Sequence, residues 1–163
     1  MKAFKNHFLF EFRTGIRDKN LLVMNYLFPL GFFALIASLM GSVNPRFIEI
    51  LIPSMIVASI LISTLLGIPD PFVKSREAGV FRSYKINGVP ATSIVMIPPI
   101  TTVLHMIIVA AIITPTAFLI FKAPLPTNWI GFILIFFLTA FAFSGLGVLI
   151  GIVSSSSRAI ILW

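Results

Sequence analysis

The sequence contains no cysteine and few charged residues, and both shortages restrict what the protein can be. Without cysteine, a disulfide framework and a thiolate metal site are excluded. Charged residues make up 10% of the chain, against about 25% in an ordinary soluble domain. Only five residues are acidic and two are histidine, and they are scattered, so the sequence predicts neither a catalytic nor a metal-binding cluster.

Apolar residues dominate what remains. They account for 58% of the chain, and the mean hydropathy is +1.08, far above the range of soluble proteins. The net charge of +7 comes from bases that flank apolar segments, where the cytoplasmic face of a membrane favours them. The composition therefore predicts an integral membrane protein with no nucleic-acid partner.

Four apolar segments are long enough to cross a bilayer, which takes about 20 residues. They are residues 21–41, 47–68, 94–121 and 129–153. Pro29 is expected to kink the first segment. In the third, Pro98 is expected to start the helix, with residues 91–97 approaching it along the interface. The predicted fold class is an all-α integral membrane protein, a polytopic helical bundle forming one transmembrane domain.

Residues 1–20 are basic and carry an aromatic stripe. Phe4, Phe8, Phe12 and Ile16 recur every four residues, which predicts a helix with one apolar face. Such a helix can lie in the membrane plane with its bases near anionic lipid. The alternative is a basic flank without fixed structure.

Small residues recur along one face of three spans, the first, the second and the fourth. Such faces let helices approach closely in lipid, where packing drives association. The spacing in the fourth span includes the Gly-x-x-x-Gly pattern. The predicted packing residues are Gly31 and Ser38 in the first span, and Ser144, Gly147 and Gly151 in the fourth.

The distribution of bases predicts the orientation. The N-terminal segment carries five Lys or Arg, the segment 69–93 carries four, and Arg158 adds one. The two remaining loops carry one each, Arg46 and Lys122. This asymmetry places both termini and residues 69–93 in the cytoplasm of a multi-pass protein of the cell membrane.

Two ionisable residues lie in or near the predicted spans. Glu49 is about one turn inside the second span, where Arg46 or the interface can satisfy it; the alternative is an ion or proton relay. His105 shares its span with no acid, Cys or second His, which favours a neutral imidazole bonded to a threonine or a neighbouring helix. The alternative is a catalytic or relay residue.

Residues 69–93 form the one long polar segment between the first apolar run and the last. Asp70-Pro71 can start a helix and Asn87-Gly88 can stop it, which predicts a single short helix. One face combines apolar and aromatic anchors with an acid, and bases flank it, as suits a protein interface. The alternative is a helix lying flat on lipid. The predicted docking residues are Arg76, Glu77, Val80, Phe81, Arg82 and Tyr84.

These features resemble the membrane subunits of type-2 ABC exporters. The resemblance rests on the basic N-terminal helix, the Pro-bearing first span, and the segment Arg76-Glu77-Ala78-Gly79-Val80-Phe81-Arg82 with Val89-Pro90 after it. It implies that residues 69–93 act as a coupling helix seated on an ATP-binding cassette subunit. It also implies a second permease copy, with ATP and Mg bound by the ATPase partner and no cofactor on this chain.

The expected function is therefore that of a permease subunit, not an enzyme, in an ATP-driven exporter. The chain has no Gly-x-x-x-x-Gly-Lys-Ser/Thr loop of its own. The alternatives are an intramembrane enzyme, for which only Ser144 and His105 offer themselves, and an ion-coupled secondary transporter, for which only Glu49 does. Because that family has six spans, Ala159–Trp163 is expected to be the start of a fifth in a C-terminally truncated chain.

Overall fold

A computed structural model describes residues 2–155, without the side chains of residues 2–5, 42 and 45. The described part is built from helices, and no strand occurs in it. In chain order they are α1 (Lys2–Arg17), α2 (Lys19–Leu22), the π-helix η1 (Val23–Leu27), α3 (Phe28–Val43), α4 (Pro45–Glu49), α5 (Leu51–Leu65), α6 (Pro69–Glu77), α7 (Val80–Ile86), α8 (Ala91–Phe121) and α9 (Trp129–Val153). Arg158 and Ala159–Trp163, the predicted start of a fifth span, lie outside the described residues.

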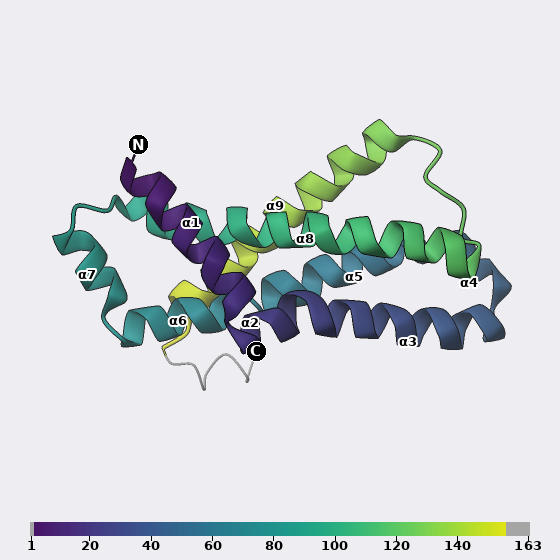
Figure 1. The fold of residues 1–163 in the computed structure, drawn as a ribbon, viewed down its shortest axis with the longest axis horizontal. Helices are drawn as coiled ribbons and strands as arrows, with labels where there is room; N and C mark the ends of the chain where they lie inside the picture. Colours follow the sequence, from purple (N-terminus) through teal and green to yellow (C-terminus); the bar gives the residue numbers. More distant parts are fainter. Residues whose placement is uncertain (1, 156–163) are drawn as a thin grey trace.

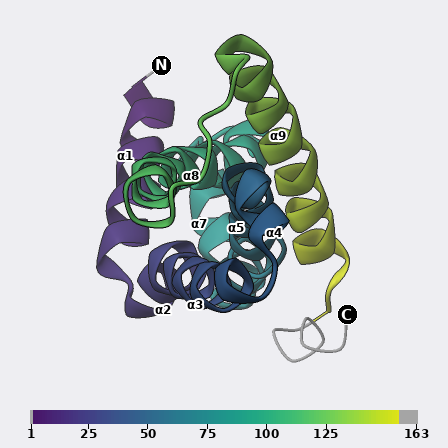
Figure 2. The ribbon, with the colours of Figure 1, turned by 90° about the vertical axis from the view of Figure 1, so that its right-hand side faces the viewer.

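Four helical stretches of the described chain are long and apolar enough to cross a membrane: Lys19–Gly41, Leu51–Glu77, Ala91–Phe121 and Trp129–Val153. The predicted polytopic bundle is thereby confirmed. Figure 1 shows α1, α6 and α7 at one end of the bundle, and α4 with the loop before α9 at the other. Seen along the bundle, α1 lies against the outer side of α8 (Figure 2).

The first span contains the predicted disturbance near Pro29, in the form of a wider helical turn. The side chain of Asp18 accepts hydrogen bonds from the backbone N–H groups of Asn20 and Leu21, which separates α1 from α2. The π-helix Val23–Leu27 then directly precedes α3, whose first turn holds Pro29. A proline ring clashes with the carbonyl four residues earlier, and a π-helical turn relieves this crowding.

The second and third spans differ from the predicted ones. Residues 47–68 do not form one helix: Asn44 caps the short α4, the chain bends at Ile50, and α5 begins at Leu51 with Pro53 in its first turn. The third helix does not start at Pro98, because α8 runs unbroken from Ala91 through both prolines. Packing of α1 along this end of α8 supports a helix that local preference alone would end.

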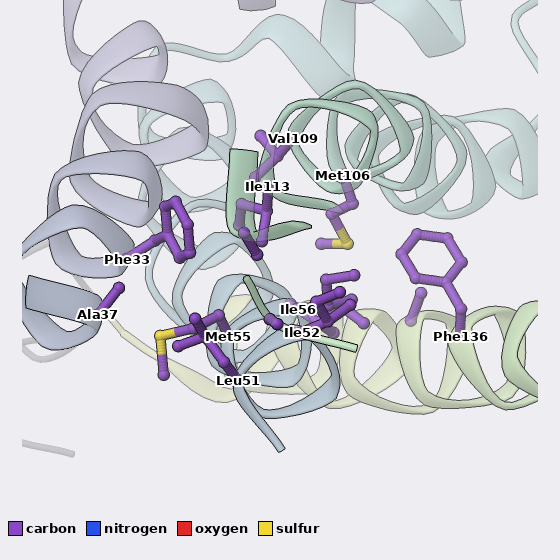
Figure 3. Packing of buried hydrophobic residues seen from close by; sticks show 14 of the residues in the cluster. Phe33, Ala37, Leu51, Ile52, Met55, Ile56, Met106, Val109, Ile113 and Phe136 are labelled. Carbon is purple, nitrogen blue, oxygen red and sulfur yellow. The ribbon is translucent and has the colours of Figure 1, made fainter. Parts of the chain in front are cut away.

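The apolar core is centred on α5, which lies between α3, α8 and α9 (Figure 3). Five of its side chains are almost fully buried: Leu51, Ile52, Met55, Ile56 and Ile60. Phe33 and Ala37 reach this core from α3, and Met106, Val109 and Ile113 reach it from α8. The core holds the four spans together.

The N-terminal helix is confirmed, and the face that it packs against the protein differs from the stripe that was predicted to meet lipid. His7 and Gly15 are buried, whereas Phe8 and Phe12 are half-buried and Ile16 is exposed. The ring of Phe12 stacks on His105 of α8 with centroids 5.0 Å apart. A methyl group on Gly15 would lie 2.6 Å from Nε2 of the same histidine, so only glycine permits this approach.

Candidate functional site

The polar segment 69–93 begins as a continuation of the second span. A turn at residues 66–68 joins α5 to α6, and α6 packs against the last part of α9. Phe72 and Val73 are buried, and the Phe72 ring lies where a side chain on Gly151 of α9 would project. The first half of the segment is therefore part of the folded bundle.

Arg76 ties α6 to the C-terminal end of α9. Its guanidinium donates to the backbone carbonyls of Gly151 (3.4 Å), Ile152 (2.9 Å) and Ser154. The last carbonyls of a helix have no partners within it and carry partial negative charge, so a cation is favoured there. The sequence predicted Arg76 as a docking residue and missed this role within the chain.

The predicted single helix in this segment is wrong: two short helices meet at Gly79. Gly79 has φ of +72°, a left-handed conformation that breaks the helix after Glu77 and precedes α7. The helix also starts earlier than predicted, at Pro69, and the Asp70 carboxylate binds Lys74 at 2.6 Å. The predicted stop is confirmed, because α7 ends at Ile86 and Gly88 has φ of +71°.

The aromatic side chains of α7 turn toward the protein itself. The ring of Phe81 packs on that of Phe72 with centroids 4.9 Å apart. Tyr84 meets His7 of α1 edge to face at 4.7 Å. Burial, and to a smaller extent the charge of Glu11, raises the pKa of the Tyr84 hydroxyl. These contacts hold α7 against α6 and α1, while Val80 is half-buried.

The outward side of the segment is polar with one large apolar residue. Glu77, Arg82 and Lys85 are exposed, and Ile86 is 78% exposed. In Figure 1, α7 projects farthest at this end of the bundle. The predicted docking residues thus divide into an inward group, Arg76, Phe81 and Tyr84, and an outward group that includes Glu77 and Arg82.

A second cluster lies between α1 and the spans, and the sequence did not predict it. Nε2 of His7 is 3.5 Å from the Glu11 carboxylate one turn later in α1. The Tyr26 hydroxyl is 2.5 Å from Nδ1 of His105, a hydrogen bond between the first and third spans. His105 therefore bonds to a neighbouring helix, as the sequence favoured over a catalytic or relay role. The i, i+4 spacing of His7 and Glu11 is the one sequence feature that points to the cluster.

The described residues contain no group of three or more His, Cys, Asp or Glu placed to hold a metal ion. The sequence profile of the ABC-2 type transporter family matches residues 3–162. This chain belongs to the ABC-2 type transporter family. No curated protein and no solved structure matched it.

Membership in the ABC-2 type transporter family makes the chain a permease component of an ABC transporter and a membrane protein. This membership argues against the two alternative functions, an intramembrane enzyme and an ion-coupled secondary transporter. The positions of the residues on which those alternatives depended agree with it. Ser144 is fully buried in α9, His105 is bonded to Tyr26, and Glu49 is exposed at the far end of the bundle.

The small residues of this ABC-2 permease occupy two kinds of position. Ser144, Gly147 and Gly151 are buried on one side of α9, where it crosses α5 and α6. Gly31 and Ser38 are instead exposed on α3, and a side chain on Gly31 would meet no atom within 4 Å. Phe33 and Ala37 make the contacts of α3 with the core. The effects of replacing Gly147 or Gly151 with a larger residue remain predictions.

Proposed function

We propose that this ABC-2 permease docks a separate ATP-binding cassette subunit through residues 69–93 and is driven by it as an exporter. The observation that carries the proposal is the division of this segment. One side is bonded into the bundle through Arg76 and Phe72, and the other presents Arg82, Lys85 and Ile86. A charged rim around an apolar anchor suits a protein partner.

The same contacts offer a route for movement. A shift of α7 imposed by the partner reaches α6 through the Phe72–Phe81 ring contact. From α6 it reaches α9 through the Arg76 hydrogen bonds and the close approach of Phe72 to Gly151. In this proposal, ATP and Mg are held by the partner, and their use moves the spans of the permease.

The orientation belongs to the same proposal. The end of the bundle with α1, α6 and α7 carries most of the bases in the described chain, while the other end carries Arg46 and Lys122. The positive-inside rule places the first end, with both termini, in the cytoplasm, where ATP is available. A second permease copy completes the transporter, and the exposed face of α3 around Gly31 and Ser38 offers it a surface of small residues.

Cross-linking tests the docking side directly. Because the chain has no cysteine, Ile86→Cys creates a single reactive site on the outward side of α7. We expect it to cross-link to an ATP-binding cassette subunit in membranes that contain both proteins. Thr127→Cys, exposed in the loop at the opposite end, is the matched control. Equal cross-linking from both positions, or none from Ile86→Cys, would reject this docking surface.

A further inference from the structure

A small cavity lined by both polar and apolar groups lies at the same end of the bundle, between α1, η1, α6 and α8. Its volume is about 60 Å³. A water needs about 10–15 Å³ of such space, so the cavity has room for a few waters or for one small polar group. Its walls include His7 and Glu11 of α1, Asn25 of η1, and Thr101 and His105 of α8.

Two buried polar atoms of the cavity residues have no hydrogen-bond partner in the described part of the chain. They are Nδ1 of His7 and Oδ1 of Asn25. His7 is 7% exposed and Asn25 is 5% exposed, and they come from different helices. Since more than nine in ten buried polar groups in proteins are paired with protein or ordered water, these two atoms call for partners from outside the described chain, either waters or one small polar ligand.

Both atoms can accept hydrogen bonds. An amide oxygen is an acceptor, and Nδ1 of His7 is an acceptor in the tautomer that carries its hydrogen on Nε2, the nitrogen 3.5 Å from the Glu11 carboxylate. The Thr101 hydroxyl donates its hydrogen to the carbonyls of Ile97 and Pro98, which leaves its oxygen as a further acceptor. A complementary ligand must therefore bring several hydrogen-bond donors.

The charged residues around the cavity also favour a ligand that donates hydrogen bonds and carries positive charge. Its lining contains no Lys or Arg, although bases are concentrated at this end of the bundle, and Glu11 is its one acidic residue. Burial raises the pKa of Glu11, and the nearby His7 opposes this rise. A carboxylate in such a place is stabilised by a cation. Phe72 and Phe81 also belong to the lining, and aromatic residues of this kind tolerate a neighbouring cation.

We propose that this cavity binds a primary ammonium group, held by Glu11, Asn25 and His7. An ammonium head supplies a positive charge and three N–H donors in a volume that the cavity accommodates. A quaternary ammonium carries the charge without the donors and is bulkier. The group has two possible sources: the ethanolamine headgroup of a phospholipid next to α1, or a free small amine. Binding here needs no ATP-binding partner and is independent of the docking function.

Thermal unfolding in the presence of ethylammonium tests the proposal. The purified chain is placed in phosphatidylcholine nanodiscs at neutral pH, and ethylammonium is compared with tetramethylammonium and K⁺. At a hundredfold excess over Kd we expect ethylammonium alone to raise Tm by about 5 °C. An equal rise with tetramethylammonium or K⁺, or no rise with ethylammonium, would overturn the proposal.

Variants locate the effect. Glu11→Gln removes the charge, and Asn25→Ala removes an acceptor without enlarging the side chain; each should abolish the ethylammonium response. Glu49→Gln, an exposed carboxylate at the opposite end, is the matched control and should keep the response. Since the two test variants alter different helices, one remains informative if the other does not fold. An undiminished response in a folded test variant contradicts the site.

The lipid composition distinguishes the two sources. If a phospholipid headgroup fills the site, nanodiscs with phosphatidylethanolamine should raise Tm by themselves and remove the response to added ethylammonium. If the ligand is a free amine, both lipid mixtures should respond to ethylammonium equally. Each of these results supports an ammonium site, and the absence of any response in both mixtures refutes it.

Discussion

The backbone carbonyl oxygen of Thr64 lies where the side chain of residue 147 would begin. A β-carbon on Gly147 would overlap that oxygen and lie 3.3 Å from the β-carbon of Ile68. The Thr64 hydroxyl donates to the carbonyl of Ile60 at 2.6 Å in its own helix and so does not hold α9. The two spans are therefore joined here by direct backbone approach, the kind of contact that small residues allow in lipid.

Replacing Gly147 with alanine should destabilise the bundle. One methyl group must push against a backbone oxygen that cannot move alone, and overpacking of this kind costs about 1–3 kcal/mol. Gly145→Ala is the matched control, because a side chain there meets nothing within 4 Å and alanine favours the helix by about 0.5–1 kcal/mol. Thermal unfolding should show a lower Tm for the first variant only. Equal Tm values would mean that α9 does not contact α5 at this position.

Arg76→Ala should loosen the end of α9. It removes the hydrogen bonds to carbonyls that have no partners within their own helix, and a hydrogen bond from a charged donor contributes about 2 kcal/mol. Arg82→Ala, on the exposed side of the neighbouring helix, should leave the stability of the purified chain unchanged. Hydrogen exchange should show earlier opening of residues 148–153 in the first variant alone. The same exchange in both variants would remove Arg76 from this role.

Long apolar helices were predictable from the sequence because their length and hydropathy are local properties. Their interruptions were not. A pair of prolines predicts the start of a helix, yet α8 continues through Pro98 and Pro99. Packing of α1 along that end of α8 supports the helix, and this contact joins residues far apart in the chain. Likewise, one residue in a left-handed conformation, Gly79, divides a segment whose capping residues predicted a single helix.

The sequence indicates where the candidate docking segment lies, but it does not indicate the directions of the side chains in that segment. Polarity and flanking bases identify residues 69–93 from the sequence alone. A short helix without a clear apolar stripe does not reveal which side faces its own protein. Phe81 and Tyr84 are aromatic residues of the kind that anchors a protein partner, but within this chain their rings pack on Phe72 and His7. The cavity lined by His7 and Asn25 forms between α1, η1, α6 and α8, and of its residues only the spacing of His7 and Glu11 gives a local pattern in the sequence.

Cysteine labelling should determine the orientation in intact cells. Thr127→Cys should react with an impermeant maleimide from outside, and Ser83→Cys should react only after the membrane is opened. Both positions are exposed, and neither side chain makes a recorded hydrogen bond, whereas Asn128 caps α9 and is better left in place. The expectation follows from the asymmetry of the bases. The reverse labelling pattern would invert the proposed topology.

Substitutions on the two sides of α7 should have different effects, one on stability and one on partner binding. Phe81→Ala removes the ring that packs on Phe72, so it should lower the Tm of the purified permease. Replacing a fully buried Phe by Ala lowers the free energy of unfolding by about 3–5 kcal/mol, and the loss should be smaller here because Phe81 is half-buried. Ile86→Ala removes a side chain that is 78% exposed, so it should leave that Tm unchanged. It should instead weaken binding of the ATP-binding subunit, because it deletes the apolar anchor on the outward side. Titration of the two proteins measures the second effect. Unchanged affinity in Ile86→Ala, with reduced affinity in a still-folded Phe81→Ala, would show that the partner contacts the ring of Phe81 and that α7 turns over when it docks.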